Sequence, residues 1–220
     1  MRLTCYASGS TGNLYSLTDG TTSLLIEAGL PLKEMQRLTG HTLSTFDDCY
    51  ISHRHNDHCA GYSDLLSRGV CVVFGGDLTQ GFDIAGTVEV RAFEVKHTVP
   101  NHGFIFKSHR DGESCVFMTD LSYSPARFDF SPTIFAIECN YADDLIPSDC
   151  AREDSIFGAH MSLKTCIEAL KANDLSRTRE IWLLHLSSAH SDEARFVREV
   201  QEATGIPTFA APAYSHKEAI

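Results

Sequence analysis

The sequence predicts an α+β protein in which two β-sheets pack face to face and helices cover their outer sides. Both halves of the chain contain short apolar runs typical of strands, with helical patterns after or between them. Polar residues accumulate at the ends of successive predicted strands, as they do where a site is built at one edge of a rigid scaffold. With 220 residues, 43% of them apolar, the chain can bury a substantial core, and we expect a single domain over residues 1–220.

In the first half, short turns separate the predicted strands. Asp19-Gly20 is a hairpin signal between two of them, and Gly40 follows a predicted helix that has Pro31 in its first turn. The strands expected here cover Arg2–Tyr6, Asn13–Leu17, Thr22–Glu27, Cys49–Ser52 and Val70–Phe74. The helices expected here cover Pro31–Thr39 and Ala60–Ser67.

In the second half, Asp111-Gly112 indicates another hairpin, and Gly205 follows the last predicted helix. The strands expected here cover Thr87–Lys96, Gly103–Lys107, Ser114–Thr119, Thr133–Ile137 and Glu180–Leu184. The helices expected here cover Leu163–Ala172 and Ser191–Thr204. Polar or charged residues directly follow several of these strands.

The stretch ISHRHNDHCAG, residues 51–61, has the highest density of metal-ligand side chains in the chain. In an extended segment His53 and His55 point the same way and can bind one ion. Asp57 and His58 would stand at the start of a following helix, where they can face a second ion. A polar surface loop rich in histidine is the alternative, but the context after an apolar strand and before Gly61 favours two metals.

Three residues at the ends of later strands are the candidates for the remaining metal ligands. His97, Asp120 and His185 each follow a predicted strand. The two oxygens of the Asp120 carboxylate can bridge two metals, which an imidazole cannot do. Imidazole and carboxylate ligands suit zinc or manganese, and no cysteine is needed.

Composition limits the compartment and the partners. The eight cysteines include no CxxC pair, which favours a reduced setting, and no run approaches the ~18 apolar residues of a membrane span. Residues 1–17 lack a charged start followed by an apolar run, so we expect a cytoplasmic protein without membrane contact. The net charge is −11, and the composition gives no obvious basic face for nonspecific binding of nucleic acid. Bound divalent metals would offset part of this negative charge at the site.

These motifs resemble a known family. HRHNDH followed by His97, Asp120 and His185 is similar to the five-part signature of the metallo-β-lactamase fold superfamily. Within it, the sequence resembles the WalJ/YycJ-like branch over nearly the whole chain. The segments that carry this resemblance are SGSTGN at 8–13, LIEAGL at 25–30, ECNY at 138–141, HMS at 160–162 and HLSSAH at 185–190.

The resemblance implies a four-layer αβ/βα sandwich with a dinuclear site, usually zinc and sometimes manganese or iron. It implies one metal on His53, His55 and His97, and the other on Asp57, His58 and His185. Asp120 would bridge the two metals. The sequence departs from the family pattern in having Glu27 where Asp is usual, and Thr98 after His97 where Asp is usual. His102 is a second histidine in that region, either a pocket or surface residue or a substrate contact.

The reaction class expected is hydrolysis, because two metals lower the pKa of a shared water and supply a bridging hydroxide as nucleophile. Asp57 would accept the proton of the nucleophile. His160 would protonate the leaving group or hold a phosphate oxygen; alternatively it is a helix-start histidine bonded to backbone. We expect Ser8, Ser10, Asn13 and Ser162 to contact substrate, although the SGSTGN segment is equally typical of a tight hairpin turn.

The resemblance implies cleavage of phosphodiesters, as in DNA exonucleases. The acidic charge and the lack of a Lys/Arg stripe favour a small phosphodiester, such as a cyclic nucleotide, as the alternative. Thioester or lactam hydrolysis is a further alternative, which the polar segments at 8–13 and 160–162 disfavour. A further hypothesis is a homodimer, in which the partner subunit supplies basic residues.

Overall fold

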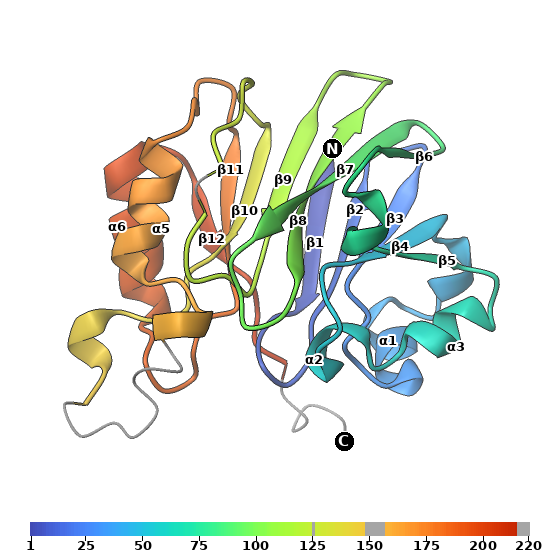
Figure 1. Ribbon diagram of the computed structural model, residues 1–220, viewed down its shortest axis with the longest axis horizontal. Helices are drawn as coiled ribbons and strands as arrows, with labels where there is room; N and C mark the ends of the chain where they lie inside the picture. The colour runs from blue at the N-terminus through green and yellow to red at the C-terminus, as the bar shows by residue number, and fades with distance from the viewer. Residues whose placement is uncertain (125, 148–156, 215–220) are drawn as a thin grey trace.

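Two mixed β-sheets packed face to face form the centre of the computed structural model, which describes residues 1–124, 126–147 and 157–214 (Figure 1). The first sheet has the strand order β1-β2-β3-β4-β5. Its strands are β1 (Arg2–Ala7), β2 (Leu14–Thr18), β3 (Ser23–Ile26), β4 (Asp48–Ile51) and β5 (Cys71–Phe74). The pairs from β1 to β3 are antiparallel, whereas β3, β4 and β5 run parallel, so β3, β4 and β5 end at the same edge.

The second sheet has the order β12-β11-β10-β9-β8-β7-β6. Its strands are β6 (Asp83–Ala85), β7 (Val88–Val95), β8 (Asn101–Ser108), β9 (Ser114–Met118), β10 (Ile134–Glu138), β11 (Glu180–Leu184) and β12 (Thr208–Ala210). The strands β9 to β12 are parallel, and the pairs from β9 back to β6 are antiparallel. The carboxyl ends of β9, β10 and β11 therefore meet at one edge.

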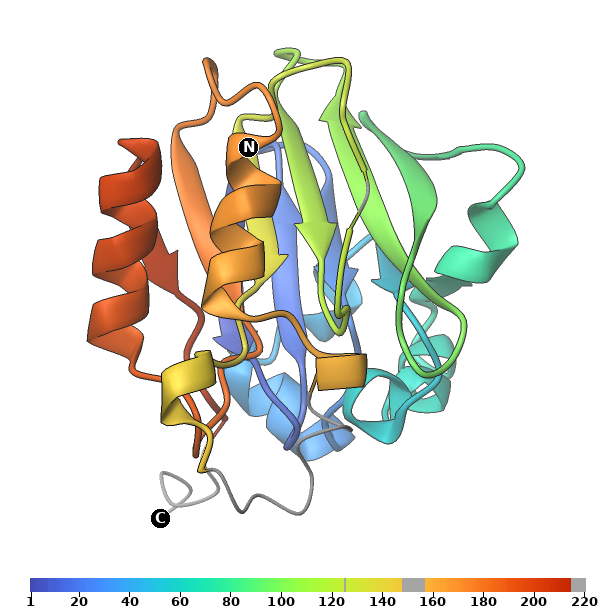
Figure 2. The same cartoon turned by 60° about the vertical axis from the view of Figure 1, so that its left-hand side comes forward.

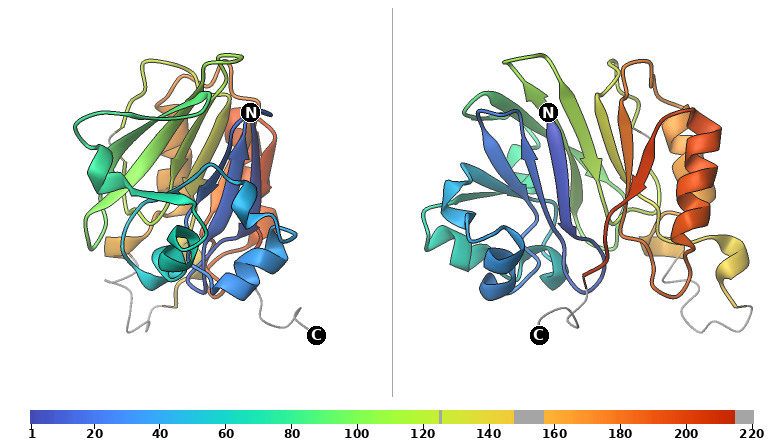
Figure 3. Two further views of the ribbon diagram at one scale, coloured as in Figure 1. Left: turned by 90° about the vertical axis from the view of Figure 1, so that its right-hand side faces the viewer. Right: turned by 180° about the vertical axis from the view of Figure 1, so that it is seen from behind.

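Helices cover the outer side of each sheet and complete four layers (Figures 1 and 2). The first sheet carries α1 (Leu32–Leu38), α2 (Asn56–Cys59) and α3 (Tyr62–Leu66), and the second carries α5 (Leu163–Lys171) and α6 (Glu193–Thr204). Short 3-10 turns are η1 (Leu43–Thr45), η2 (Gly75–Leu78) and η3 (Asp143–Leu145). Figure 3 shows the two sets of helices on opposite sides of the molecule. None of the helices that the structure describes has the length and apolar character needed to cross a membrane.

Three clusters of buried side chains fill the three interfaces between the four layers. The cluster between the sheets contains Tyr15 and Phe117, whose ring centroids lie 5.0 Å apart, edge to face. A second cluster joins the second sheet to α5 and α6 through residues such as Phe196. The third joins the first sheet to α1 and α3 through Met35 and Leu65. This arrangement confirms the predicted α+β class and the four-layer αβ/βα sandwich.

The element predictions hold with three differences. The strands β6 and β12 were not predicted, because three residues are too few to show an alternating pattern. The helix predicted over 60–67 is shorter than expected: α3 covers only Tyr62–Leu66, and Gly61 separates it from α2, which precedes the predicted range. A Cβ on Gly61 would lie within 2.6 Å of the Leu30 carbonyl oxygen, so only glycine lets these backbones approach.

One buried carboxylate joins the two sheets at the edge far from the ends of β4 and β9. Asp19, in the hairpin between β2 and β3, accepts hydrogen bonds from Thr87 Oγ1 (2.6 Å) and Ser108 Oγ (2.9 Å) of the second sheet, and from the backbone N–H groups of Thr21 and Thr22. Burial opposes ionisation of Asp19, but these hydrogen bonds outweigh it and hold its pKa well below the usual value. The carboxylate therefore stabilises the folded state only while it is charged.

We expect Asp19→Asn to lower the free energy of unfolding at neutral pH by about 2 kcal/mol, the scale of hydrogen bonds to a charged group. Because the folded-state pKa lies below the unfolded value, this contribution is present above about pH 4 and is lost as the pH falls further. Urea unfolding of both proteins across this range tests the prediction. The exposed Asp77→Asn serves as control, and a pH-independent difference for Asp19→Asn would contradict the role of charge.

Candidate metal centre

The candidate site lies where the loops after β4, β7, β9 and β11 meet, at one end of the facing sheets (Figure 1). The structure places all the predicted metal ligands here, in two groups whose ligand atoms lie within 4.8 Å of one another in each group. The first group is His53, His55 and His97, and the second group is Asp57, His58, Asp120 and His185. The two groups are adjacent, because the ring centroids of His53 and His58 lie 4.2 Å apart.

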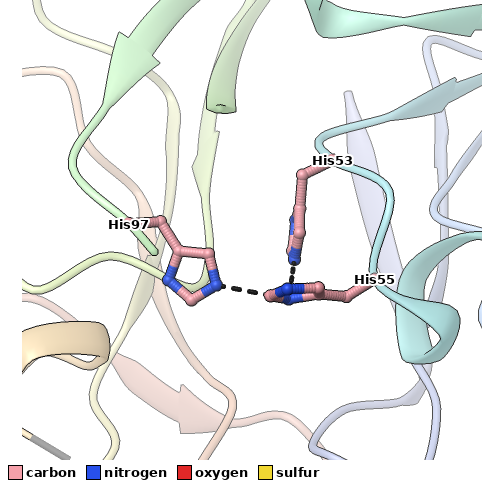
Figure 4. Close-up of side chains that lie close together, drawn as sticks. All are labelled: His53, His55 and His97. Carbon is pink, nitrogen blue, oxygen red and sulfur yellow. Dashed lines mark hydrogen bonds between the residues drawn. The ribbon is translucent and has the colours of Figure 1, made fainter. Parts of the chain in front are cut away.

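In the first group, three imidazole nitrogens converge from two sheets. His53 Nε2 lies 3.0 Å and His97 Nε2 lies 3.4 Å from His55 Nδ1 (Figure 4). His97 Nδ1–H donates to the carbonyl oxygen of Ala159 at 3.1 Å, which leaves the lone pair of Nε2 directed at the group. His53 Nδ1 lies 2.9 Å from Ser52 Oγ. Fixing one ring nitrogen in this way orients the other for a metal ion.

The first group favours neutral imidazole. Burial, followed by the neighbouring His58, lowers the pKa of His53 to about 3. Burial also lowers the pKa of His97. Neutral imidazole is the form that binds a metal ion, so both side chains are ready to act as ligands at neutral pH.

In the second group, two imidazoles face two carboxylates. His58 Nε2 lies 3.0 Å from Asp120 Oδ2 and 3.5 Å from Asp57 Oδ2. His185 Nε2 lies 3.6 Å from Asp120 Oδ1 and 3.9 Å from Asp57 Oδ2. The two oxygens of Asp120 therefore face different histidines.

The second group fits a cation better than it fits internal hydrogen bonds. His185 Nε2 is buried and has no hydrogen-bond partner among the described residues, although two carboxylates face it. Burial disfavours charge on His185, but Asp120, Asp57 and Glu138 outweigh it and raise its pKa to about 10. The pKa of His58 is raised in the same way against the effect of burial, chiefly by Asp120. The carboxylates thus favour a positive charge in this group. A divalent ion can supply that charge in place of the protons on His58 and His185.

Glu27 contacts the second group through His58. It is fully buried, its Oε1 lies 3.4 Å from His58 Nδ1, and its Oε2 accepts from the Ser52 N–H at 3.3 Å. A carboxylate on the distal nitrogen of a metal-binding histidine fixes the ring and raises its basicity. The longer side chain of Glu27, which departs from the family pattern, therefore still reaches His58.

Left-handed backbone conformations cluster at this site. Among the described non-glycine residues with positive φ are Glu27 (63°), Asp120 (54°) and His185 (54°). Each of them directly follows or closely follows a strand, and the conformation turns its side chain from the strand direction toward the ligand groups. Such backbone costs about 1–3 kcal/mol per residue and is found where function requires a given side-chain direction.

Buried polar side chains hold the ligand loops in place. Asn13 Nδ2 donates to the Asp57 carbonyl oxygen at 3.0 Å. Asn140 Nδ2 donates to the His185 carbonyl oxygen at 2.6 Å, and Ser8 Oγ accepts from the His185 N–H at 2.8 Å. These bonds join the loops after β1, β4, β10 and β11, which are distant in the sequence.

Glu138 is a site residue that was not predicted. It is fully buried at the end of β10, and its Oε1 accepts from His160 Nδ1–H at 2.7 Å and lies 3.5 Å from His185 Nδ1. Its Oε2 accepts from the Leu121 N–H at 2.6 Å. Asp120, Glu138, His160 and His185 form a third group of potential ligands. The available signal was the position of Glu138 at a strand end, which it shares with Glu27.

His160 lies beside the metal ligands. Its ring stacks on His185 with centroids 5.2 Å apart and planes 17° apart. Burial opposes its charge, but Glu138 outweighs burial and raises the pKa of His160. The sequence analysis left open that His160 is a helix-start histidine bonded to backbone. In the structure its Nδ1 bonds instead to the carboxylate of Glu138.

The predicted substrate contacts have different environments. Ser8 and Asn13 are buried, whereas Ser10 is exposed. Ser162 caps α5 by accepting from the Thr165 N–H at 3.1 Å. A role of these four residues in substrate binding stays a prediction.

His102 is buried in β8 beside the metal loop. Its Nδ1 lies 3.4 Å from the Ser52 carbonyl oxygen. A Cβ on Gly75 would lie 2.5 Å from His102 Cβ, so η2 packs tightly on this ring. His102 therefore packs between η2 and the segment that precedes His53, and a contact with substrate stays a prediction.

Comparisons with known proteins show relatives in sequence and in fold. No family model matches the chain. The exodeoxyribonuclease WalJ of Streptococcus pneumoniae serotype 2 (strain D39 / NCTC 7466) is 24% identical, over 84% of this chain and 81% of WalJ. The exodeoxyribonuclease YycJ of Bacillus anthracis is 23% identical, over 82% and 80%. The metallo-β-lactamase fold protein YhfI of Bacillus subtilis superposes with a TM-score of 0.75 at 16% identity, over 97% of each chain.

This protein has the metallo-β-lactamase fold, as its motifs predicted. Among proteins of known activity, its sequence resembles the exodeoxyribonucleases of the WalJ/YycJ-like branch.

Glu27→Gln keeps the shape of the side chain and removes its charge. We expect the variant to bind metal about 10-fold more weakly, the lower end of the effect of losing a carboxylate that orients a metal-binding histidine. Competition with a chelator of known affinity measures this change. Glu94→Gln alters an exposed glutamate and serves as control. Equal affinities of the two variants would show that Glu27 does not orient His58.

Proposed function

We propose that this protein is a metal-dependent hydrolase of phosphodiester bonds that acts on nucleic acid in the manner of an exonuclease. The observation that carries the proposal is the pair of adjacent histidine and aspartate groups at the meeting ends of the two sheets. The similarity to the exodeoxyribonucleases WalJ and YycJ supports the substrate class.

The proposed cofactor is a pair of divalent ions, zinc first, with manganese or iron as alternatives. His53, His55 and His97 would hold one ion, and Asp57, His58 and His185 the other. Asp120 would lie between them, which is supported by its two oxygens facing different histidines. When bound, two such ions lower the pKa of a water molecule and offset charge on the attacked phosphate.

The protein's own groups would move the protons. Asp57 is the most accessible carboxylate of the second group, with a side chain 24% exposed against 4% for Asp120. It can therefore accept the proton of the attacking water. His160 is held at Nδ1 by Glu138, so its Nε2 is free to donate a proton to the leaving oxygen. Because Glu138 also faces His185, the proton donor keeps a fixed position relative to the metal ligands.

We expect the loss of a ligand and the loss of the proton donor to differ in metal content. Asp120→Ala and His55→Ala remove a ligand, so both metal and activity should fall. His160→Ala should keep its metal and lose about 100-fold or more in turnover, the usual effect of removing a general acid. Metal analysis beside steady-state kinetics separates the two cases. The exposed His109→Ala is the control, and full activity of Asp120→Ala would refute the site.

The substrate class is tested with bis-p-nitrophenyl phosphate, linear DNA and cyclic nucleotides, each in zinc and in manganese. We expect turnover of the small diester and progressive shortening of DNA. Turnover of cyclic nucleotides alone would favour the small phosphodiester that the acidic composition suggested. No turnover of any phosphodiester by the metal-loaded protein would refute the proposal and direct attention to thioesters and lactams.

The homodimer stays a prediction. A single species of 24.3 kDa in light scattering would contradict it.

A further inference from the structure

Two exposed cations flank the first group of histidines. Arg54 stands between His53 and His55, and Lys96 directly precedes His97. The neighbouring ligands His55 and His97 approach within 3.4 Å, Nδ1 to Nε2, so the two cations lie on two loops that meet at this group, one loop from each sheet. They are the lysine or arginine residues adjacent in sequence to the candidate ligands.

The Arg54 side chain is held in place by an aromatic ring. Its guanidinium carbon lies 3.9 Å from the centroid of Phe74. Phe74 ends β5 and pairs with Ile51 of β4, so this ring lies at the same edge of the sheet as the metal loop. A guanidinium stacked on a ring keeps its N–H edge available for a phosphate, and the stacking limits the number of side-chain conformations.

Lys96 has an exposed aromatic neighbour. Tyr123 forms an antiparallel bridge with Lys96, and the Ser122 N–H donates to the Lys96 carbonyl oxygen at 3.0 Å. The Tyr123 side chain is 50% exposed, although it lies only three residues beyond Asp120. An exposed ring beside a cation is a combination that proteins use to bind single-stranded nucleic acid.

Internal ion pairing does not account for these two cations. Arg91, Arg179 and Arg195 each lie within 2.9 Å of a carboxylate oxygen. Arg54 and Lys96, in contrast, form no ion pair with any carboxylate of the described residues. In a chain with a net charge of −11, cations that have no carboxylate partner in the described part of the chain provide local attraction for an anion beside the metal site.

We propose that Arg54 and Lys96 bind the phosphates next to the scissile phosphate of a single-stranded nucleic acid, and that Tyr123 stacks on one of its bases. This inference rests on the proposed function and narrows its substrate. Two cations contact about two phosphates, whereas tight duplex binders contact about 6–10. The protein would therefore bind only a few nucleotides of the strand, and an exonuclease would bind them at the strand's end. Such a short contact is compatible with the net acidic charge of the chain.

The test measures kcat/KM for a single-stranded oligodeoxynucleotide over a series of salt concentrations, with bis-p-nitrophenyl phosphate in parallel. Arg54→Gln and Lys96→Gln should each reduce the slope of log kcat/KM against log salt by about 0.7, the contribution of one phosphate contact in a single strand. Tyr123→Ala should raise KM for the oligonucleotide about 10-fold through lost stacking. Turnover of the small diester should stay unchanged in all three variants.

Matched controls are Arg198→Gln on the exposed side of α6 and Lys171→Gln at the far end of α5. Metal content checks that each variant keeps its centre, and Lys96→Arg should restore the slope. An unchanged slope in Arg54→Gln and Lys96→Gln, with DNA still degraded, overturns the inference and leaves the proposed function standing. An equal loss on both substrates also overturns it, because the residues then act on the centre itself. A wild-type protein inactive on every phosphodiester overturns both.

Discussion

Buried charge at the meeting ends of the two sheets is the constraint on which the site depends. Glu27, Asp120 and Glu138 are at most 3% exposed, and His58 is fully buried. A buried carboxylate without a partner is strongly disfavoured, so each of these acids must face a cation or a hydrogen-bond donor. Each one faces at least one imidazole, which explains why ligands and supporting residues form one continuous network.

This network ties together segments that are far apart in the sequence. Ser8 and Asn13 come from the loop after β1, yet they bond to the backbone of His185 and Asp57. Because both sheets contribute ligands to each group, the packing of the sheets also sets the spacing of the ligands within each group. The apolar cluster between the sheets therefore fixes the geometry of the metal centre, although none of its members is a ligand.

The acidic composition and a nucleic-acid substrate are compatible when charge is considered locally. The net charge of −11 is a property of the whole surface, and salt screens it beyond about 10 Å. Two divalent ions, with Arg54 and Lys96 beside them, would make the mouth of the site positive. An enzyme that holds only the end of a strand needs no extended basic surface.

The sequence by itself determined most of the strands and helices and the seven candidate ligands, because local patterns and the dense motif at 53–58 carry that information. Tertiary structure alone decided that Glu138 belongs to the site. The parallel pairing of β10 with β11 brings the end of β10 beside His185, and the fold brings His160 within hydrogen-bond distance of Glu138. It also decided the edge strands β6 and β12, whose three residues are strands only because neighbours pair with them. Side-chain direction at a strand end is set by long-range packing, which no local pattern records.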